Sequence, residues 1–161
     1  MKTSERVLVA ATTAFGEFGY DAISLDDLAK ELGIRKQSIL YHFPSKEQLL
    51  AASVDRAIAE LVAVLDEAIE KSGNGWGRVE SIVKSVFRLA IRRPELLGLL
   101  REVTRLGPPV LTRAIEGVNP LIKGATGWMK DEMDAGRMRK SDPELVVLSI
   151  YSTVMGAATE V

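Results

Sequence analysis

Few side chains of this 161-residue chain could carry out covalent or metal chemistry. It contains no cysteine, and its only histidine is His42, next to Tyr41. No carboxylate stands at a spacing that would share a helix face with His42, so neither a metal site nor a nucleophile and its base can be assembled there. Adjacent carboxylates such as Asp26 and Asp27 diverge on a helix. We therefore expect that the chain is not an enzyme and uses no cofactor or metal.

Polar side chains of another kind gather in residues 24–47, SLDDLAKELGIRKQSILYHFPSKE. Hydroxyl groups and cations bind phosphate oxygens, and arginine or glutamine can also recognise base edges in a DNA groove. The net charge of −1 gives no general support for nucleic-acid binding. However, Arg35, Lys36 and Lys46 cluster in this segment, whereas acids such as Asp26 fall before it or on the helix behind it. Local placement outweighs the sum of charges, which favours a nucleic-acid-binding surface here.

The same segment contains the residues that start and end two short helices. Ser24 can cap a helix that begins at the next residue, with Asp27 at its third position. Gly33 supplies the left-handed backbone that ends this helix, and a second helix over 36–42 must stop before Pro44. Two short helices joined by a glycine turn are typical of a helix-turn-helix, in which the second helix enters the major groove. The alternative is a corner between two helices of an ordinary helical domain.

Gly33-Ile34, the sequence LYHFPSKE at 40–47, and the upstream Phe15 and Gly19 decide between these alternatives. Over residues 4–50 the chain resembles the DNA-binding domain of the TetR family of bacterial transcriptional regulators. The resemblance implies an all-α fold, with an N-terminal three-helix helix-turn-helix domain and a C-terminal helical domain for ligand binding and dimerisation. The positions that it assigns to DNA contact, mostly at phosphates, are Ser24, Lys36, Gln37, Ser38, Tyr41, His42 and Lys46.

Two positions depart from the family pattern. Leu40 stands where the family usually has tyrosine, so that phosphate contact is either lost or taken over by Tyr41. Arg35 stands where a serine or threonine usually caps the second short helix; it cannot cap in that way, but it can reach a phosphate or a guanine edge, and we add it to the DNA-contacting set. These departures leave a second hypothesis open, a helical ligand-binding or protein-interaction module that has lost DNA binding.

The remaining sequence predicts further helices and no strand. A long amphipathic helix over about 45–72 ends at Gly73-Asn74-Gly75, and it should join a DNA-binding domain at 1–47 to a second domain at 48–161. A first helix over 4–18 should form the small core with the apolar residues of one face, namely Val7, Leu8, Ala11, Phe15 and Phe18. The other expected helices are 76–93, 95–106, 110–138 and one from 143. Pro120 and Gly124 should kink or interrupt the third of these.

Residues 145–159 are uncharged but shorter than the roughly 20 residues that cross a bilayer, so we expect no membrane span. A helix that is apolar all round must be buried on every side, which predicts a homodimer interface in which Gly156, Ala157 and Ala158 allow close approach. The apolar run reaches Val161, and the family commonly has one more helix, so the chain is expected to be truncated there. The lack of cysteine and of a signal peptide suits the cytoplasm.

The resemblance also implies a small-molecule site in the C-terminal domain. Side-chain type alone selects as candidates Phe87, Leu97, Leu100, Arg101, Thr104, Trp128, Met129, Met133 and Tyr151. Each could equally belong to the core or to an interface. The sequence therefore predicts a dimeric regulator, most often a repressor in this family, that binds a palindromic operator and is released by an unidentified small molecule. A coupling of about 1–3 kcal/mol between the two sites would suffice.

Overall fold

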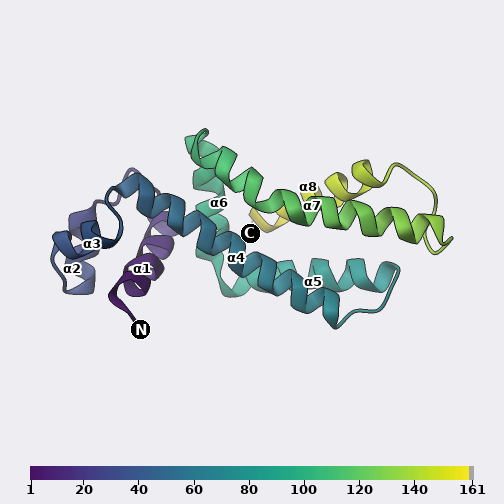
Figure 1. Cartoon of the computed structure of the whole chain (residues 1–161), viewed down its shortest axis with the longest axis horizontal. Coiled ribbons are helices and arrows are strands. Elements are labelled where there is room, and N and C mark those ends of the chain that lie inside the picture. The colour runs from purple at the N-terminus through teal and green to yellow at the C-terminus, as the bar shows by residue number, and fades with distance from the viewer. Residues whose placement is uncertain (160–161) are drawn as a thin grey trace. The chain divides into compact units, whose positions relative to one another are not determined.

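The computed structural model describes residues 1–159, and these form an all-α fold, as predicted (Figure 1). The expected chain end at Val161, and the side chains of Ala157 and Ala158 at the expected interface, lie outside what is described. The helices of the described residues are α1 Thr3–Phe18, α2 Leu25–Leu32, α3 Lys36–His42, α4 Lys46–Glu70, α5 Trp76–Arg92, α6 Pro94–Leu106, α7 Val110–Asp134 and α8 Pro143–Thr159.

The helices form two compact units. The N-terminal unit consists of Met1–Ile58 together with Arg93–Ala114, and the C-terminal unit consists of Ala59–Arg92 together with Ile115–Val161. Both α4 and α7 pass from one unit to the other along the chain. This division differs from the one drawn at residue 47 from the sequence, because α6 packs against α1 and thereby joins the helix-turn-helix unit.

The core of the N-terminal unit is built around the fully buried Phe15 of α1. Apolar side chains from α2, α3 and α4 surround it, including Leu28, Ile39 and Leu49. Phe18 was expected in this core but is 65% exposed. The position next to Phe15 is instead occupied by Tyr20 from the following loop, with the two ring centroids 5.5 Å apart. The chain turns at the end of α1, so a loop residue covers the core that helix periodicity had assigned to Phe18.

Helices α1 and α6 touch through their backbones. A Cβ atom added to Gly98 of α6 would lie 2.0 Å from the carbonyl oxygen of Gly16, and one added to Gly16 would lie 2.0 Å from the carbonyl oxygen of Glu95. No side chain fits between two helices at this separation. Glycine inside a helix is unfavourable by itself, and its place here is explained by this close crossing.

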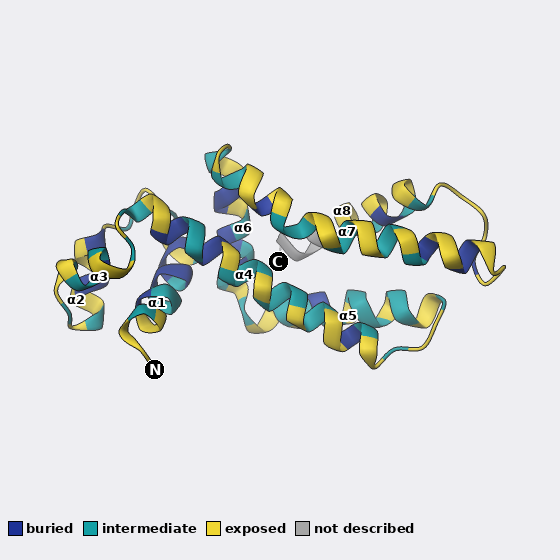
Figure 2. Cartoon of the chain, viewed as in Figure 1, coloured by how far each residue is buried: buried dark blue, intermediate teal, exposed yellow. Residues whose placement is uncertain are grey.

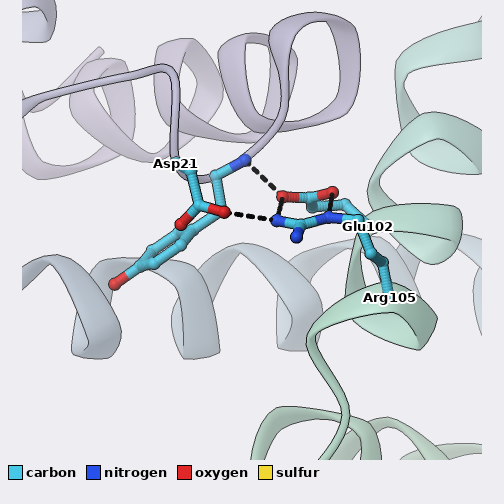
Figure 3. Close-up of polar contacts among 4 residues, drawn as sticks. Asp21, Glu102 and Arg105 are labelled. Carbon is cyan, nitrogen blue, oxygen red and sulfur yellow. Dashed lines mark hydrogen bonds and ion pairs between the residues drawn. The ribbon is translucent and has the colours of Figure 1, made fainter.

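A buried carboxylate on α6 also holds the loop between α1 and α2 (Figure 3). The backbone N–H of Tyr20 donates to Glu102 Oε1 over 2.6 Å, and Arg105 donates to both oxygens of Glu102 over 2.8 Å. Arg105 Nη2 also donates to Asp21 Oδ2 over 2.7 Å. The hydrogen bonds from Arg105 hold the pKa of Glu102 below its usual range despite the burial of the carboxyl group. Helix α6 is thus fixed to the N-terminal unit by polar as well as backbone contacts.

The C-terminal unit has its own core, formed by Met129, Met133, Met138 and Val147 of α7, α8 and the segment between them. Glu132 is buried beside this core, where it accepts the Gly75 N–H over 3.0 Å and pairs with Arg137 at 2.7 Å. The guanidinium of Arg137 is the main cause of the lowered pKa of Glu132. This carboxylate ties the loop before α5 to the end of α7.

Helix α7 continues through Pro120, so of the two outcomes that the sequence predicted there, a kink or an interruption, the interruption does not occur. Proline removes the hydrogen bond to the carbonyl group of Glu116, four residues earlier. Both residues are exposed, so water can bind the carbonyl oxygen that is left. Within the described residues, no helix combines the length and the apolar character needed to span a membrane.

Substituting Gly98→Ala should destabilise the N-terminal unit. The new methyl group would meet the backbone of α1, which cannot move aside as a side chain can, so we expect a loss of about 1–3 kcal/mol in the free energy of unfolding. Gly124→Ala on α7 is the matched control, because nothing lies within 4 Å of its added Cβ. It should gain up to about 1 kcal/mol from helix propensity. Chemical denaturation followed by circular dichroism measures both, and equal effects would contradict the close crossing.

Substituting Glu102→Gln should cost about 1–2 kcal/mol of stability near neutral pH, because the amide cannot form the charged pair with Arg105. Because the fold lowers the pKa of Glu102 from its ordinary value of 4.5, the ionised carboxylate stabilises the folded state when the pH is above 4.5. This stabilisation is lost as the pH falls below that value and the carboxylate takes up a proton. The stability difference between wild type and variant should therefore shrink in acid. Denaturation between about pH 7 and pH 3 tests this. Glu116→Gln on the surface is the control, and a difference independent of pH would refute the assignment.

Candidate nucleic-acid interface

Helix α2 begins and ends as its sequence predicts. Ser24 Oγ accepts the Asp27 N–H over 3.1 Å, and Asp27 Oδ2 accepts the Ser24 N–H over 2.9 Å, which completes a capping box. The Ser24 hydroxyl also donates to Asp27 Oδ2, and this bond is the main cause of the lowered pKa of Asp27. Gly33 ends the helix with φ 65° in the left-handed region. The hydroxyl of Ser24 is therefore engaged within the cap, and it must reorient if it is to donate to a phosphate.

Helix α3 carries exposed residues (Figure 2), and the exposed ones are polar. Arg35, Gln37, Tyr41 and His42 are exposed on or beside it, while Ile39 is fully buried. Tyr41 is 83% exposed and meets the His42 ring edge-on, with centroids 5.0 Å apart. Arg35 occupies the N-cap position and makes no side-chain cap. The helix thus presents hydrogen-bonding groups on the side away from its core.

Leu40 departs from the family pattern for a structural reason. Its side chain is partly buried and packs against the core of the N-terminal unit. The neighbouring Tyr41 points outward instead, so a phenol is still available on α3 one position later in the chain. Ser38 and Lys36 are half-buried on the same helix.

The structure brings an acid to the surface where the sequence had placed only cations. Lys36 Nζ lies 2.7 Å from Asp26 Oδ2, and the side chains of Lys36 and Asp26 are 41% and 67% exposed. Asp26 lies on α2, the helix behind α3, as the sequence indicated. The ion pair was not foreseen: the turn at Gly33 brings the start of α2 beside the start of α3, so the Asp26 carboxylate reaches Lys36. Asp26 therefore competes with any phosphate for the ammonium group of Lys36.

Lys46 begins α4 and is held by a residue that sequence analysis missed. Its Nζ lies 4.1 Å from the ring centroid of Tyr20. The Ser45 hydroxyl accepts the Gln48 N–H over 3.2 Å and so caps α4. The Tyr20 hydroxyl donates to Glu47 Oε1 over 3.1 Å. Tyr20 stands in a loop, where helix periodicity gives no signal; its place directly after the helix-ending Gly19 was the only indication in the sequence.

The candidate ligand residues divide between the two units. Leu97, Leu100, Arg101 and Thr104 belong to α6 in the N-terminal unit, whereas Phe87, Trp128, Met129, Met133 and Tyr151 belong to the C-terminal unit. Met129 and Met133 are buried in the core. The Thr104 hydroxyl donates to the carbonyl oxygen of Leu100 over 3.0 Å. The guanidinium carbon of Arg78 lies 5.1 Å from the Trp128 ring centroid. The ligand site remains a prediction from the sequence.

A capped helix, a left-handed glycine and a short helix with an exposed polar face define the helix-turn-helix class of DNA-binding domains. Residues 7–53 match the sequence profile of the bacterial regulatory proteins of the tetR family. Residues 7–53 of the chain therefore form a DNA-binding domain of the TetR type, as the sequence predicted.

Relatives and solved structures agree with this assignment. The chain is 26% identical to the HTH-type transcriptional regulator RutR of Escherichia coli strain K12 over 91% of this chain and 69% of RutR. It is 39% identical to IcaR of Staphylococcus epidermidis, named as a negative transcriptional regulator of a biofilm operon, over 52% of this chain and 45% of IcaR. The structure of FadR from Bacillus subtilis with stearoyl-CoA superposes with a TM-score of 0.87 at 17% identity, over 97% of this chain and 85% of FadR. This likeness confirms the TetR-like fold.

Substituting Asp26→Asn should strengthen DNA binding, because it frees Lys36 and removes one negative charge beside the interface. We expect the affinity for DNA to rise about two- to tenfold at low salt. The slope of the logarithm of the binding constant against the logarithm of the salt concentration should become steeper by up to about one per protomer. Fluorescence anisotropy with a labelled duplex, titrated at several salt concentrations, measures both. Asp66→Asn on the exposed part of α4 makes the same change in net charge and should have little effect. Equal gains in both variants would show that the ion pair is irrelevant.

Proposed function

We propose that this protein is a dimeric, ligand-responsive transcriptional repressor that acts in the cytoplasm on a palindromic operator. The observation that carries the proposal is the exposed polar face of α3, flanked by Lys46 at the first residue of α4. A major groove accepts a helix of this kind, and the cations beside it can bind the phosphates that border the groove. Repression is supported by the relative IcaR, which is named as a negative regulator.

Dimerisation is supported by helix α8. Leu145, Leu148 and Tyr151 are exposed at three-residue spacing along it, so apolar side chains follow one face of the helix. A second copy of the chain would cover this face, and a two-fold dimer would present two α3 helices to half-sites about 34–36 Å apart. Dimerisation would also double the number of phosphate contacts, which the few cations of one protomer make necessary for useful affinity.

Control by a small molecule is supported by the course of α4. This helix is continuous from Lys46, at the DNA-contacting end, to Glu70 in the C-terminal unit. A ligand that shifted α4 would change the separation of the two α3 helices, and a coupling of about 1–3 kcal/mol would release an operator. The ligand candidates are the sequence-selected residues of α5 to α8. If every compound that binds the protein left its DNA affinity unchanged, this mechanism would be excluded.

Selection of bound sequences from a random duplex DNA pool tests the proposal directly. The full chain is used, and selection is run at two salt concentrations. Enrichment of a palindrome, weaker at the higher salt, is the expected result. A folded, dimeric protein that enriches nothing would overturn the proposal and favour a ligand-binding or protein-interaction module without DNA binding. The recovered palindrome then serves to screen small molecules, acyl-CoA thioesters among them, for release of the DNA.

The double substitution of Tyr41→Ala with Lys46→Ala should abolish most operator binding while the protein stays folded. Both side chains belong to the proposed phosphate-contacting surface, and the loss of two such contacts should weaken binding about tenfold or more. Anisotropy with the selected palindrome measures the affinity, and circular dichroism confirms the fold. Lys123→Ala, an exposed lysine on α7, is the control for a lost positive charge. Unchanged binding in the double variant would place the DNA-contacting surface elsewhere.

A further inference from the structure

Tyr20 makes more specific contacts than a loop residue needs for packing alone. One contact is to the Phe15 ring, whose centroid lies 5.5 Å away. Its backbone N–H donates to Glu102 Oε1 over 2.6 Å, and its hydroxyl donates to Glu47 Oε1 over 3.1 Å. The ammonium nitrogen of Lys46 lies 4.1 Å from the ring centroid. All four partners lie in the N-terminal unit.

The contacts of Tyr20 with residues other than Lys46 hold its aromatic ring in place. The hydrogen bond to Glu102 fixes the backbone of the loop and Phe15 supports the ring, so the ring is held in place without its hydroxyl group. The hydrogen bond from the hydroxyl group to Glu47 is an additional contact. Burial and the neighbouring Glu47 raise the pKa of Tyr20 to about 12, so the hydroxyl keeps its proton and remains a donor at any physiological pH. The ring is therefore a rigid platform with a constant charge state.

Lys46 by contrast has a long, flexible stem. A lysine on the surface loses much rotamer freedom when it binds a phosphate, and that loss opposes binding. The face of an aromatic ring attracts an ammonium group and restricts it without neutralising its charge. An acid would also restrict the lysine, as Asp26 does with Lys36, but it would then compete with the phosphate. A ring leaves the hydrogen-bond donors of the ammonium group available to DNA.

We propose that Tyr20 is a positioning residue for DNA binding, which holds the ammonium group of Lys46 over its ring so that it meets a backbone phosphate with little loss of freedom. This inference rests on the proposed function. It assigns to Tyr20 a role in affinity that acts only through Lys46, and it requires the ring but not the hydroxyl group.

A double-mutant cycle tests the proposal. The full-length wild type, Tyr20→Leu, Lys46→Ala and the double variant are titrated against a labelled duplex of mixed sequence at several salt concentrations, since phosphate contacts do not depend on base sequence. Tyr20→Leu should weaken binding about two- to fivefold in the wild-type background, and it should have no further effect once Lys46 is alanine. Tyr20→Phe keeps the ring and should bind DNA as the wild type does.

A purely structural role would give a different result. Damage to the fold would weaken binding by the same factor with and without Lys46, and that additive result would overturn the inference. A second measurement does not involve DNA: in the free protein, the ring should shift the NMR signals of the Lys46 side-chain protons upfield. This shift should persist in Tyr20→Phe and vanish in Tyr20→Leu, and its absence from the wild type would also overturn the inference.

The same titrations separate the inference from the proposed function. If the folded wild type binds no duplex at low salt, DNA binding itself is excluded and the role of Tyr20 falls with it. If the wild type binds, and Lys46→Ala lowers the slope of log affinity against log salt concentration by about one per protomer, a contact between Lys46 and a phosphate is supported. The comparison of Tyr20→Leu in the two backgrounds then decides on Tyr20 alone.

Discussion

The helix-turn-helix unit depends on its contact with α6. Two glycines let the backbones of α1 and α6 touch, and the buried carboxylate of Glu102 binds the loop that follows α1. A carboxylate in a nearly dry site is stable only when its hydrogen-bonding capacity is used, and Arg105 with the Tyr20 N–H meets that need. The DNA-binding end of the protein is therefore completed by a helix from much later in the chain.

Two lysines of the candidate interface have partners within the protein. Lys36 is paired with Asp26, and Lys46 lies against an aromatic ring. The ion pair with Asp26 lowers the affinity of Lys36 for a phosphate. The ring of Tyr20 restricts Lys46 without forming an ion pair with it. A surface with few available cations gains less of its affinity from phosphates and more from groove complementarity, which is why the proposed function includes a second protomer. It would be less prone to bind DNA of any sequence than a strongly basic surface.

The two ends of α4 belong to different units. Its first turns carry Lys46 and pack into the N-terminal core, while its last turns belong to the C-terminal unit. In the proposed mechanism, this continuous helix is the element whose shift would link a ligand in the C-terminal unit to the position of α3. The chain enters the N-terminal unit again at Arg93, just before α6, and leaves it at Ala114 in α7.

The sequence alone determined the local elements: the capped start of α2 at Ser24, the end at Gly33 and the polar face of α3 follow from short-range rules of capping and periodicity. Tertiary structure alone decided the rest. The exposure of Phe18, the pairing of Asp26 and the joining of α6 to α1 depend on contacts between distant segments, which no periodicity encodes. Side-chain type could nominate ligand residues, but the grouping of such residues in space is a property of packing. For that reason the DNA-binding helix was predictable, whereas its supports were not.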